Sequence, residues 1–209
     1  MQNIEAMLRQ AQAEMDAMGA ETYLNRAYSE NPTPEFTRLN EEWALGIFAE
    51  RYNKRHSPKL FFVCHNPPHS NKADFSVYGE DRPFLCDIEI TILWPTPTVK
   101  SPKGYEDFNP YSPDPVFGSP FLDVSRPPKV PAYARLEQIL KKHLRDKYRP
   151  YWLVIRDNNH VKRPNLAQLA DLTRTILEAE AKRGKLPANL QQVWVFDENE
   201  PEPKQVVLP

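Results

Sequence analysis

The sequence predicts a single α/β domain, because short segments with the two-residue apolar period of strands are interleaved with longer segments of helical period. The chain of 209 residues fits one domain, over 1–209, and is long enough to bury a sizeable core. Its composition, 40% hydrophobic and 26% charged residues, is ordinary for a soluble globular protein.

Neither a membrane span nor an export signal is expected. No apolar run reaches the length of a transmembrane helix, and the first twenty residues lack the apolar centre of a signal peptide. We therefore expect a cytoplasmic protein without membrane partners, in which Cys64 and Cys86 are buried and reduced. The formal charge of -1 excludes a global electrostatic signature of nucleic-acid binding, so such a role requires a local basic patch.

Two helices are expected before the first strand. Residues 1–30 form a helical extension in which apolar side chains recur at helical spacing. The second helix begins at Pro34, with Thr33 as its N-cap, and lies within 31–56. Its predicted apolar stripe consists of Phe36, Leu39, Trp43 and Ile47.

Three strands are predicted next, at 59–66, 74–79 and 84–94. Loops of ordinary hairpin or short-turn length join them. The third strand is rich in β-branched residues and almost continuously apolar, which is typical of a central strand.

The segment 95–131 interrupts this pattern, since it holds ten of the chain's 22 prolines. Proline fixes its own φ and cannot donate to a β-ladder, so an irregular segment is expected. Its interspersed aromatic residues favour an ordered flap. After it, a helix at 132–148 and a strand at 151–158 are followed by a helix at 165–184 and a last strand at 191–198, which form the C-terminal part 165–198.

Three carboxylates lie inside the strand patterns, where apolar side chains are the rule. Asp87 and Glu89 share one face of the third strand, and Asp74 begins the second. If the two strands are neighbours, one sheet face collects Asp74 with Asp87 or with Glu89. A divalent cation would relieve the repulsion and desolvation of such carboxylates, and Mg²⁺ commonly binds one or two of them.

A half-solvated sheet face is the alternative explanation, because alternating acids cost little there. Leu85 and Leu93, on the acidic face of the same strand, speak against a solvated face. The strand pattern alone leaves both interpretations open.

The order of elements and the placement of the acids resemble the PD-(D/E)xK superfamily of nucleases, also called restriction-endonuclease-like. The core of that family is a helix, three strands, a helix and a strand, which is the order predicted here over 35–158. Its motif is an Asp at the start of the second strand and (D/E)xK on the third. Asp74 matches the first part, and the tripeptide 87–89 (DIE) or 89–91 (EIT) matches the second.

This chain lacks the in-strand Lys of the family. That position holds Glu89 in the first register and Thr91 in the second. Some family members have Glu there, and others take the Lys from the following helix, where this chain offers Lys141 and Lys142, and also Gln138.

A Glu on the first helix often completes the family's site. Glu42 is the best match, at the edge of the predicted apolar stripe. Glu41 and Glu50 are alternatives, and Glu50 projects more squarely onto that stripe.

The resemblance implies Mg²⁺- or Mn²⁺-dependent hydrolysis of phosphodiester bonds in nucleic acid, DNA in preference to RNA. The basic helix 135–149 carries six Arg or Lys against two acids and could contact phosphates. The implied metal ligands are Asp74 with Asp87 or Glu89. The implied catalytic residues are Glu42, Asp74, Asp87, Glu89, Lys141 and Lys142.

Two other functions fit the same sequence. Without the in-strand Lys, the chain could be a non-catalytic binding module on the nuclease fold. It could also be an unrelated α/β protein that assembles, as a homodimer for example, through residues 1–30 and the proline-rich arm. A zinc site at Cys64, His65 and His69 is not favoured, because further ligands at suitable spacing are missing from the sequence.

Overall fold

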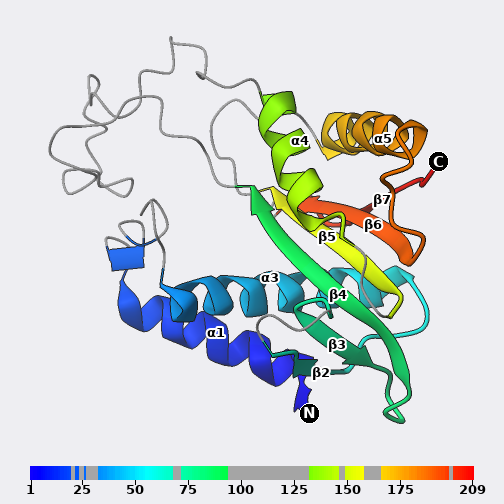
Figure 1. The fold of residues 1–209 in the computed structure, drawn as a ribbon. Helices are drawn as coiled ribbons and strands as arrows, with labels where there is room; N and C mark the ends of the chain where they lie inside the picture. The colour runs from blue at the N-terminus through cyan, green and yellow to red at the C-terminus, as the bar shows by residue number, and fades with distance from the viewer. Residues whose placement is uncertain are drawn as a thin grey trace, which may run out of the picture.

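A seven-stranded mixed β-sheet forms the middle layer of the molecule, with helices on both faces (Figure 1). The structure is a computed structural model. It describes residues 1–19, 22–23, 26, 33–67, 72–93, 132–145, 149–157, 166–197 and 200–209. The strands are β1 (Gln2–Asn3), β2 (Phe62–His65), β3 (Phe75–Tyr78), β4 (Phe84–Leu93), β5 (Tyr151–Asp157), β6 (Leu190–Asp197) and β7 (Lys204–Val206). The described helices are α1 (Ile4–Met18), α3 (Pro34–Arg55), α4 (Ala132–His143) and α5 (Leu166–Lys182).

The strands lie in the sheet in the same order as in the chain. β1 to β4 run antiparallel to one another, β4, β5 and β6 are parallel, and β7 returns antiparallel to β6. The parallel strands require crossover helices, which α4 and α5 supply. In Figure 1, α1 and α3 cover one face of the sheet, while α4 and α5 cover the other.

The predicted mixture of helices and strands is confirmed, with small differences at the ends of elements. Thr33 caps α3 as expected, since its side-chain oxygen accepts a hydrogen bond from the backbone N–H of Phe36 at 3.3 Å. β1 and β7 are not predicted, because strands of two and three residues carry too little periodicity to detect. The predicted flap at 95–131 lies outside the described residues.

The residues of β4 divide between the two faces as the alternation predicts. Ile88 and Ile90 pack toward α3, while Asp87 and Glu89 point to the face that α4 covers. Leu85, expected beside the acids, instead packs against the core on the α3 side. The reason is a register shift in the ladder between β3 and β4 at this end, since a bulge reverses the facing of the residues beyond it.

Helix α3 is held from two directions. Phe48 and Tyr52 lie against the sheet, with ring centroids 5.9 Å from Trp194 and 5.5 Å from Trp152, respectively. A second side of α3 receives α1, whose apolar residues Ile4, Met7 and Ala11 are buried. The buried surface of α3 is therefore broader than the predicted stripe, in which Trp43 and Ile47 are only half-buried.

None of the helices in the described part of the chain has the length and apolar character needed to span a bilayer.

The close approach of α1 to α3 depends on Gly46. A Cβ atom added there would lie 2.6 Å from Leu8 Cβ and 2.9 Å from Leu8 Cδ1. We predict that Gly46→Ala lowers the free energy of unfolding by about 1–3 kcal/mol, because overpacking outweighs the gain of up to ~1 kcal/mol in helix propensity. Urea denaturation checks this. In the Leu8→Ala background the same substitution should become neutral or stabilising, and an unchanged cost there would contradict the assigned contact.

Candidate functional site

Asp74 lies at the point where β3 begins to pair with β4. Asn66 fixes the backbone here, because its N–H donates to Asp74 O at 2.9 Å and its side-chain amide donates to Ala73 O at 2.7 Å. β3 starts at Phe75, opposite Ile88, so β4 continues past the start of its neighbour. The carboxylate of Asp74 takes up the ladder position, with Oδ2 accepting from the N–H of Ile90 at 2.9 Å. Asp74 is thereby attached to β4 next to Glu89.

Glu89 projects from β4 toward the end of α4. Its side chain is nearly buried, and Oε1 lies 3.0 Å from His143 Nδ1. Leu140 and Leu136, one and two turns before His143 on α4, are buried against the sheet. The same face of the helix therefore brings the imidazole to the carboxylate.

Glu41, on α3, is the third acid at this position. Burial is the main cause, and the negative charges of Asp74, Glu89 and Glu42 add to it; together they raise the pKa of its carboxyl from the ordinary 4.5 to about 8. The carboxyl groups of Asp74, immediately before β3, and of Glu89 on β4 thus lie within electrostatic range of Glu41 on α3. We refer to Glu41, Asp74 and Glu89 as the carboxylate cluster.

Asp87 is not part of this cluster, although it is only two residues from Glu89. Its side chain is fully buried, and Arg149 donates to both of its oxygens, from Nε at 3.0 Å and Nη2 at 2.6 Å. Ser76 donates a further hydrogen bond at 2.8 Å. A bidentate guanidinium neutralises this carboxylate, so of the two β4 acids predicted to join Asp74, the geometry brings only Glu89 to it.

The predicted acids of α3 are also separated by the structure. Glu42 points toward β2, where its Oε1 lies 2.8 Å from His65 Nε2 and 3.0 Å from Arg38 Nε. Glu50 is exposed and pairs with Lys54. Glu41, an alternative at the level of sequence, is the α3 residue whose carboxyl interacts with both Asp74 and Glu89.

The two predicted lysines of α4 do not lie against the cluster. Lys141 Nζ is 2.6 Å from Glu137 and 3.9 Å from Glu180, on the side of α4 that faces α5. The hydrogen bond from Lys141 lowers the pKa of Glu137. Lys142 is exposed. Both remain predictions as phosphate contacts.

Helical spacing alone could have identified the two residues that sequence reasoning did not select. His143 lies three residues after Leu140 and seven after Leu136, which places it on the buried face of α4. Glu41 precedes Leu45 by four residues and Phe48 by seven, both fully buried. Glu41 is therefore on the line of α3 that faces the sheet.

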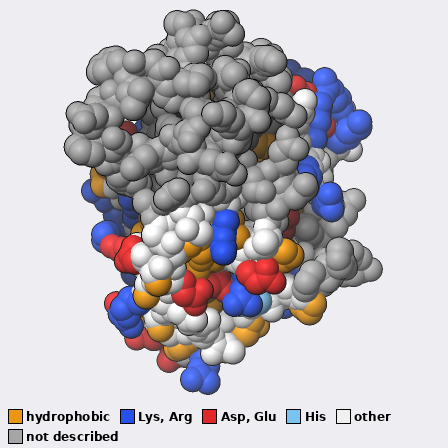
Figure 2. All heavy atoms as spheres, turned by 90° about the vertical axis from the view of Figure 1, so that its left-hand side faces the viewer, with side chains coloured by type: hydrophobic (Ala, Val, Ile, Leu, Met, Phe, Trp, Pro, Cys, Tyr) orange, Lys and Arg blue, Asp and Glu red, His pale blue; other side chains and the backbone are white. Residues whose placement is uncertain are grey.

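The cluster does not converge on a single point as it stands. Among the described residues, no three His, Cys, Asp or Glu side chains are arranged as a ready set of metal ligands. Over the part of the molecule that the structure describes, Figure 2 shows acidic and basic side chains interspersed on the face in view.

The chain's likeness to known proteins was tested in three ways. No family model matches the sequence, and neither a curated protein nor a solved structure is detectably similar to it.

The raised pKa of Glu41 makes stability depend on pH. The folded protein binds a proton that the unfolded chain releases near 4.5, so the free energy of unfolding should fall as pH rises from about 4.5 to about 8. We predict that Glu41→Gln flattens this slope and makes the variant more stable than the parent at pH 8, by an amount on the order of a few kcal/mol. Urea unfolding at several pH values measures it. Parallel pH profiles for variant and parent would contradict the assignment.

The pair formed by Asp87 and Arg149 gives a second prediction. Arg149→Met leaves a charged carboxylate in the core with only Ser76 as a partner, so the free energy of unfolding should fall by about 3–5 kcal/mol. Chemical denaturation at pH 7 measures the loss. The double variant Asp87→Asn with Arg149→Met should recover much of it, because the amide carries no charge. If the loss of unfolding free energy in the double variant equals the sum of the losses in Asp87→Asn and Arg149→Met, the two side chains are not coupled.

Proposed function

We propose that the protein is a metal-dependent nuclease with a restriction-endonuclease-like core. The order of α3, β2, β3, β4, α4 and β5 supports the proposal, as do the antiparallel pairing of the first three strands and the parallel pairing of the last two. The observation that carries it is the attachment of Asp74 to Ile90 N–H, beside Glu89. This is the juxtaposition that the (D/E)xK motif requires, in the register that reads Glu89-Ile90-Thr91.

The carboxylate cluster has suitable chemistry for a hard divalent cation. Asp74 and Glu89 would hold Mg²⁺ or Mn²⁺ through carboxylate oxygens, and Glu41 would complete the set directly or through water. Burial is the main cause of the raised pKa of Glu41, and the negative charges of Asp74 and Glu89 contribute to it; a cation would offset that part. When bound, such an ion supplies the positive charge that polarises a phosphoryl oxygen and activates water.

The remaining residues of the site orient the acids. His143 donates from Nδ1 to Glu89 and so fixes the direction of that carboxylate. Thr91, nearly buried and on the same face of β4 as Glu89, stands where the family has Lys and offers only a hydroxyl. Lys141 and Lys142 could contact the phosphates of DNA from the exposed side of α4. Lys141 would first have to leave Glu137.

A binding module without catalysis is the second candidate. Thr91 in place of Lys, and the absence of a ready set of metal ligands among the described residues, favour it. Calorimetric titration with Mn²⁺ separates the two candidates. The nuclease requires binding that Asp74→Ala abolishes, whereas the module requires none.

The nuclease proposal predicts divalent-cation-dependent cleavage of DNA that depends on the cluster. Asp74→Ala and Glu89→Gln should each lower the cleavage rate at least about 100-fold, since both remove a proposed ligand. A gel assay with Mg²⁺ or Mn²⁺ on single- and double-stranded substrates measures it. Asp81→Ala, which removes an exposed acid in the turn between β3 and β4, is the matched control. Cleavage that persists unchanged in Asp74→Ala would defeat the site assignment.

A further inference from the structure

Three aromatic side chains form a row across the antiparallel half of the sheet. Phe62 of β2 pairs with Tyr78 of β3, and Tyr78 pairs with Phe84 of β4. Their neighbours Val63 and Val77 are buried toward α3, so the row lies on the opposite face. On that face α4 packs on β4, and α5 packs on β6 and β7. The row lies beyond both helices, at the lower end of the sheet in Figure 1.

Two guanidinium groups stack on this row. Arg82 Cζ lies 5.3 Å from the centroid of the Phe62 ring, and Arg149 Cζ lies 4.3 Å from that of Phe84. The Tyr78 and Phe84 rings meet edge to face at 5.8 Å. We call these five residues the aromatic–arginine platform. It consists of three rings on neighbouring strands, with a guanidinium group over the ring at each end of the row.

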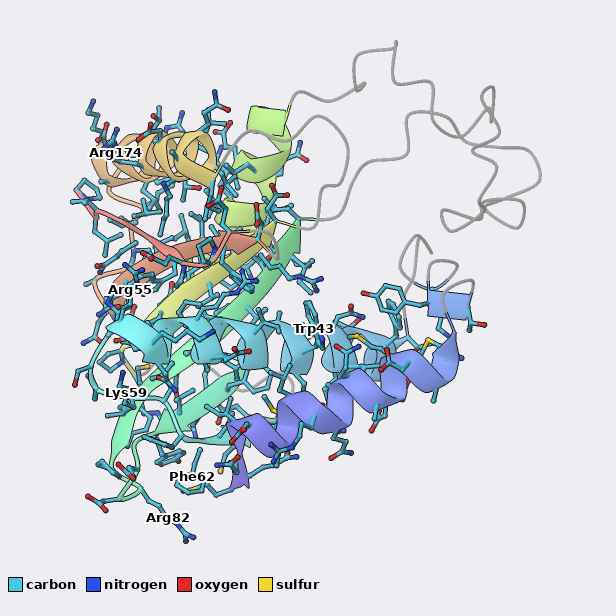
Figure 3. All side chains as sticks on the ribbon, turned by 180° about the vertical axis from the view of Figure 1, so that it is seen from behind. Trp43, Arg55, Lys59, Phe62, Arg82 and Arg174 are labelled. Atoms are coloured by element: carbon cyan, nitrogen blue, oxygen red, sulfur yellow. The ribbon has the colours of Figure 1, made fainter. Side chains whose placement is uncertain are left out.

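The backbone at Arg82 adopts the left-handed conformation. Arg82 has a φ of 62° in a turn closed by hydrogen bonds from Arg82 N to Gly79 O at 3.0 Å and from Gly79 N to Pro83 O at 2.9 Å. Residues other than glycine seldom adopt this left-handed conformation. Figure 3 shows Arg82 at the tip of the β3–β4 hairpin, close to Phe62. Unusual backbone conformations of this kind concentrate at functional positions.

The exposure of the platform is also unusual. Phe84 is 39% exposed, and the other large exposed apolar residues in the described part of the chain, Met1 and Val207, lie near the chain ends. The side chain of Arg149 is 33% exposed. Arg82 is exposed and has no ion-pair partner among the described residues. The platform therefore presents both ring surface and positive charge to solvent.

We propose that the aromatic–arginine platform binds single-stranded nucleic acid. Unpaired bases stack on aromatic rings and on guanidinium planes, and arginines also contact phosphates. A duplex keeps its base faces covered and cannot use such a surface. The choice of a nucleic acid rests on the proposed function, whereas the platform itself does not.

The platform lies close to the carboxylate cluster along β4. Arg149 stacks on Phe84 and binds Asp87, and Asp87 is two residues from Glu89 on the same face of β4. Two residues of a strand span about 7 Å. A strand of nucleic acid stacked on the platform would therefore carry its backbone to Asp74 and Glu89. The substrate class that this arrangement selects is an unpaired end or a single-stranded region.

The test is equilibrium binding by the full chain carrying Asp74→Ala, so that no cleavage occurs. Fluorescence anisotropy compares a labelled single strand of about 20 nucleotides, as DNA and as RNA, with a blunt duplex of the same sequence. Arg82→Ala and Phe84→Leu should each weaken binding of the single strand about fivefold or more, while Phe84→Trp, which keeps an aromatic ring, retains it. The DNA and RNA arms distinguish the two sources of unpaired bases.

Arg174→Ala is the matched control for charge. Arg174 is an exposed arginine of α5, far from Arg82 in Figure 3, and its loss should leave the affinity unchanged. Equal affinity for the single strand and the duplex, or equal effects of Arg82→Ala and Arg174→Ala, would overturn the inference.

The outcome is independent of that for nuclease activity. If the parent protein cleaves nothing but binds the single strand through the platform, the binding proposal holds and the nuclease proposal is wrong. If the parent protein cleaves DNA but its binding is unchanged by substitution of Arg82 and Phe84, the nuclease proposal holds and the binding proposal is wrong.

Discussion

Like-charge repulsion within the carboxylate cluster is the constraint on which the proposed site depends. Glu41 lies on α3, Asp74 immediately before β3 and Glu89 on β4, and the charges of Asp74 and Glu89 both act on Glu41. A different interaction offsets the repulsion and the loss of hydration at each acid. Asp74 accepts a backbone N–H, Glu89 accepts from an imidazole, and Glu41 keeps its proton up to a pH of about 8.

Asp87, the neighbouring acid of β4, is compensated by a paired cation instead. Asp87 is fully buried, and the guanidinium of Arg149 compensates its charge through two hydrogen bonds. Such a pair holds β4 to the start of β5 and leaves no charge to attract a cation. Two carboxylates on one strand face therefore differ in chemistry because of what lies opposite each of them. Asp87 pairs with a guanidinium, whereas Glu89 lies beside Asp74 and within electrostatic range of Glu41.

The succession of helices and strands was predictable from periodicity, and so was the pairing of acids on one face of β4. The choice between Asp87 and Glu89 was not, because it depends on Arg149, which is 62 residues from Asp87 in the chain. Nothing in a single sequence marks that contact. The bulge that turns Leu85 away from the acids was likewise hidden, since it arises from the register between two strands.

Crystals soaked in Mn²⁺ and measured for anomalous scattering test the central claim most directly. Our account predicts one strong peak bounded by the carboxylates of Asp74 and Glu89, with Glu41 turned toward it, and none beside Asp87. Saturating Mn²⁺ that leaves this position without a peak, or that binds only elsewhere on the molecule, would contradict it.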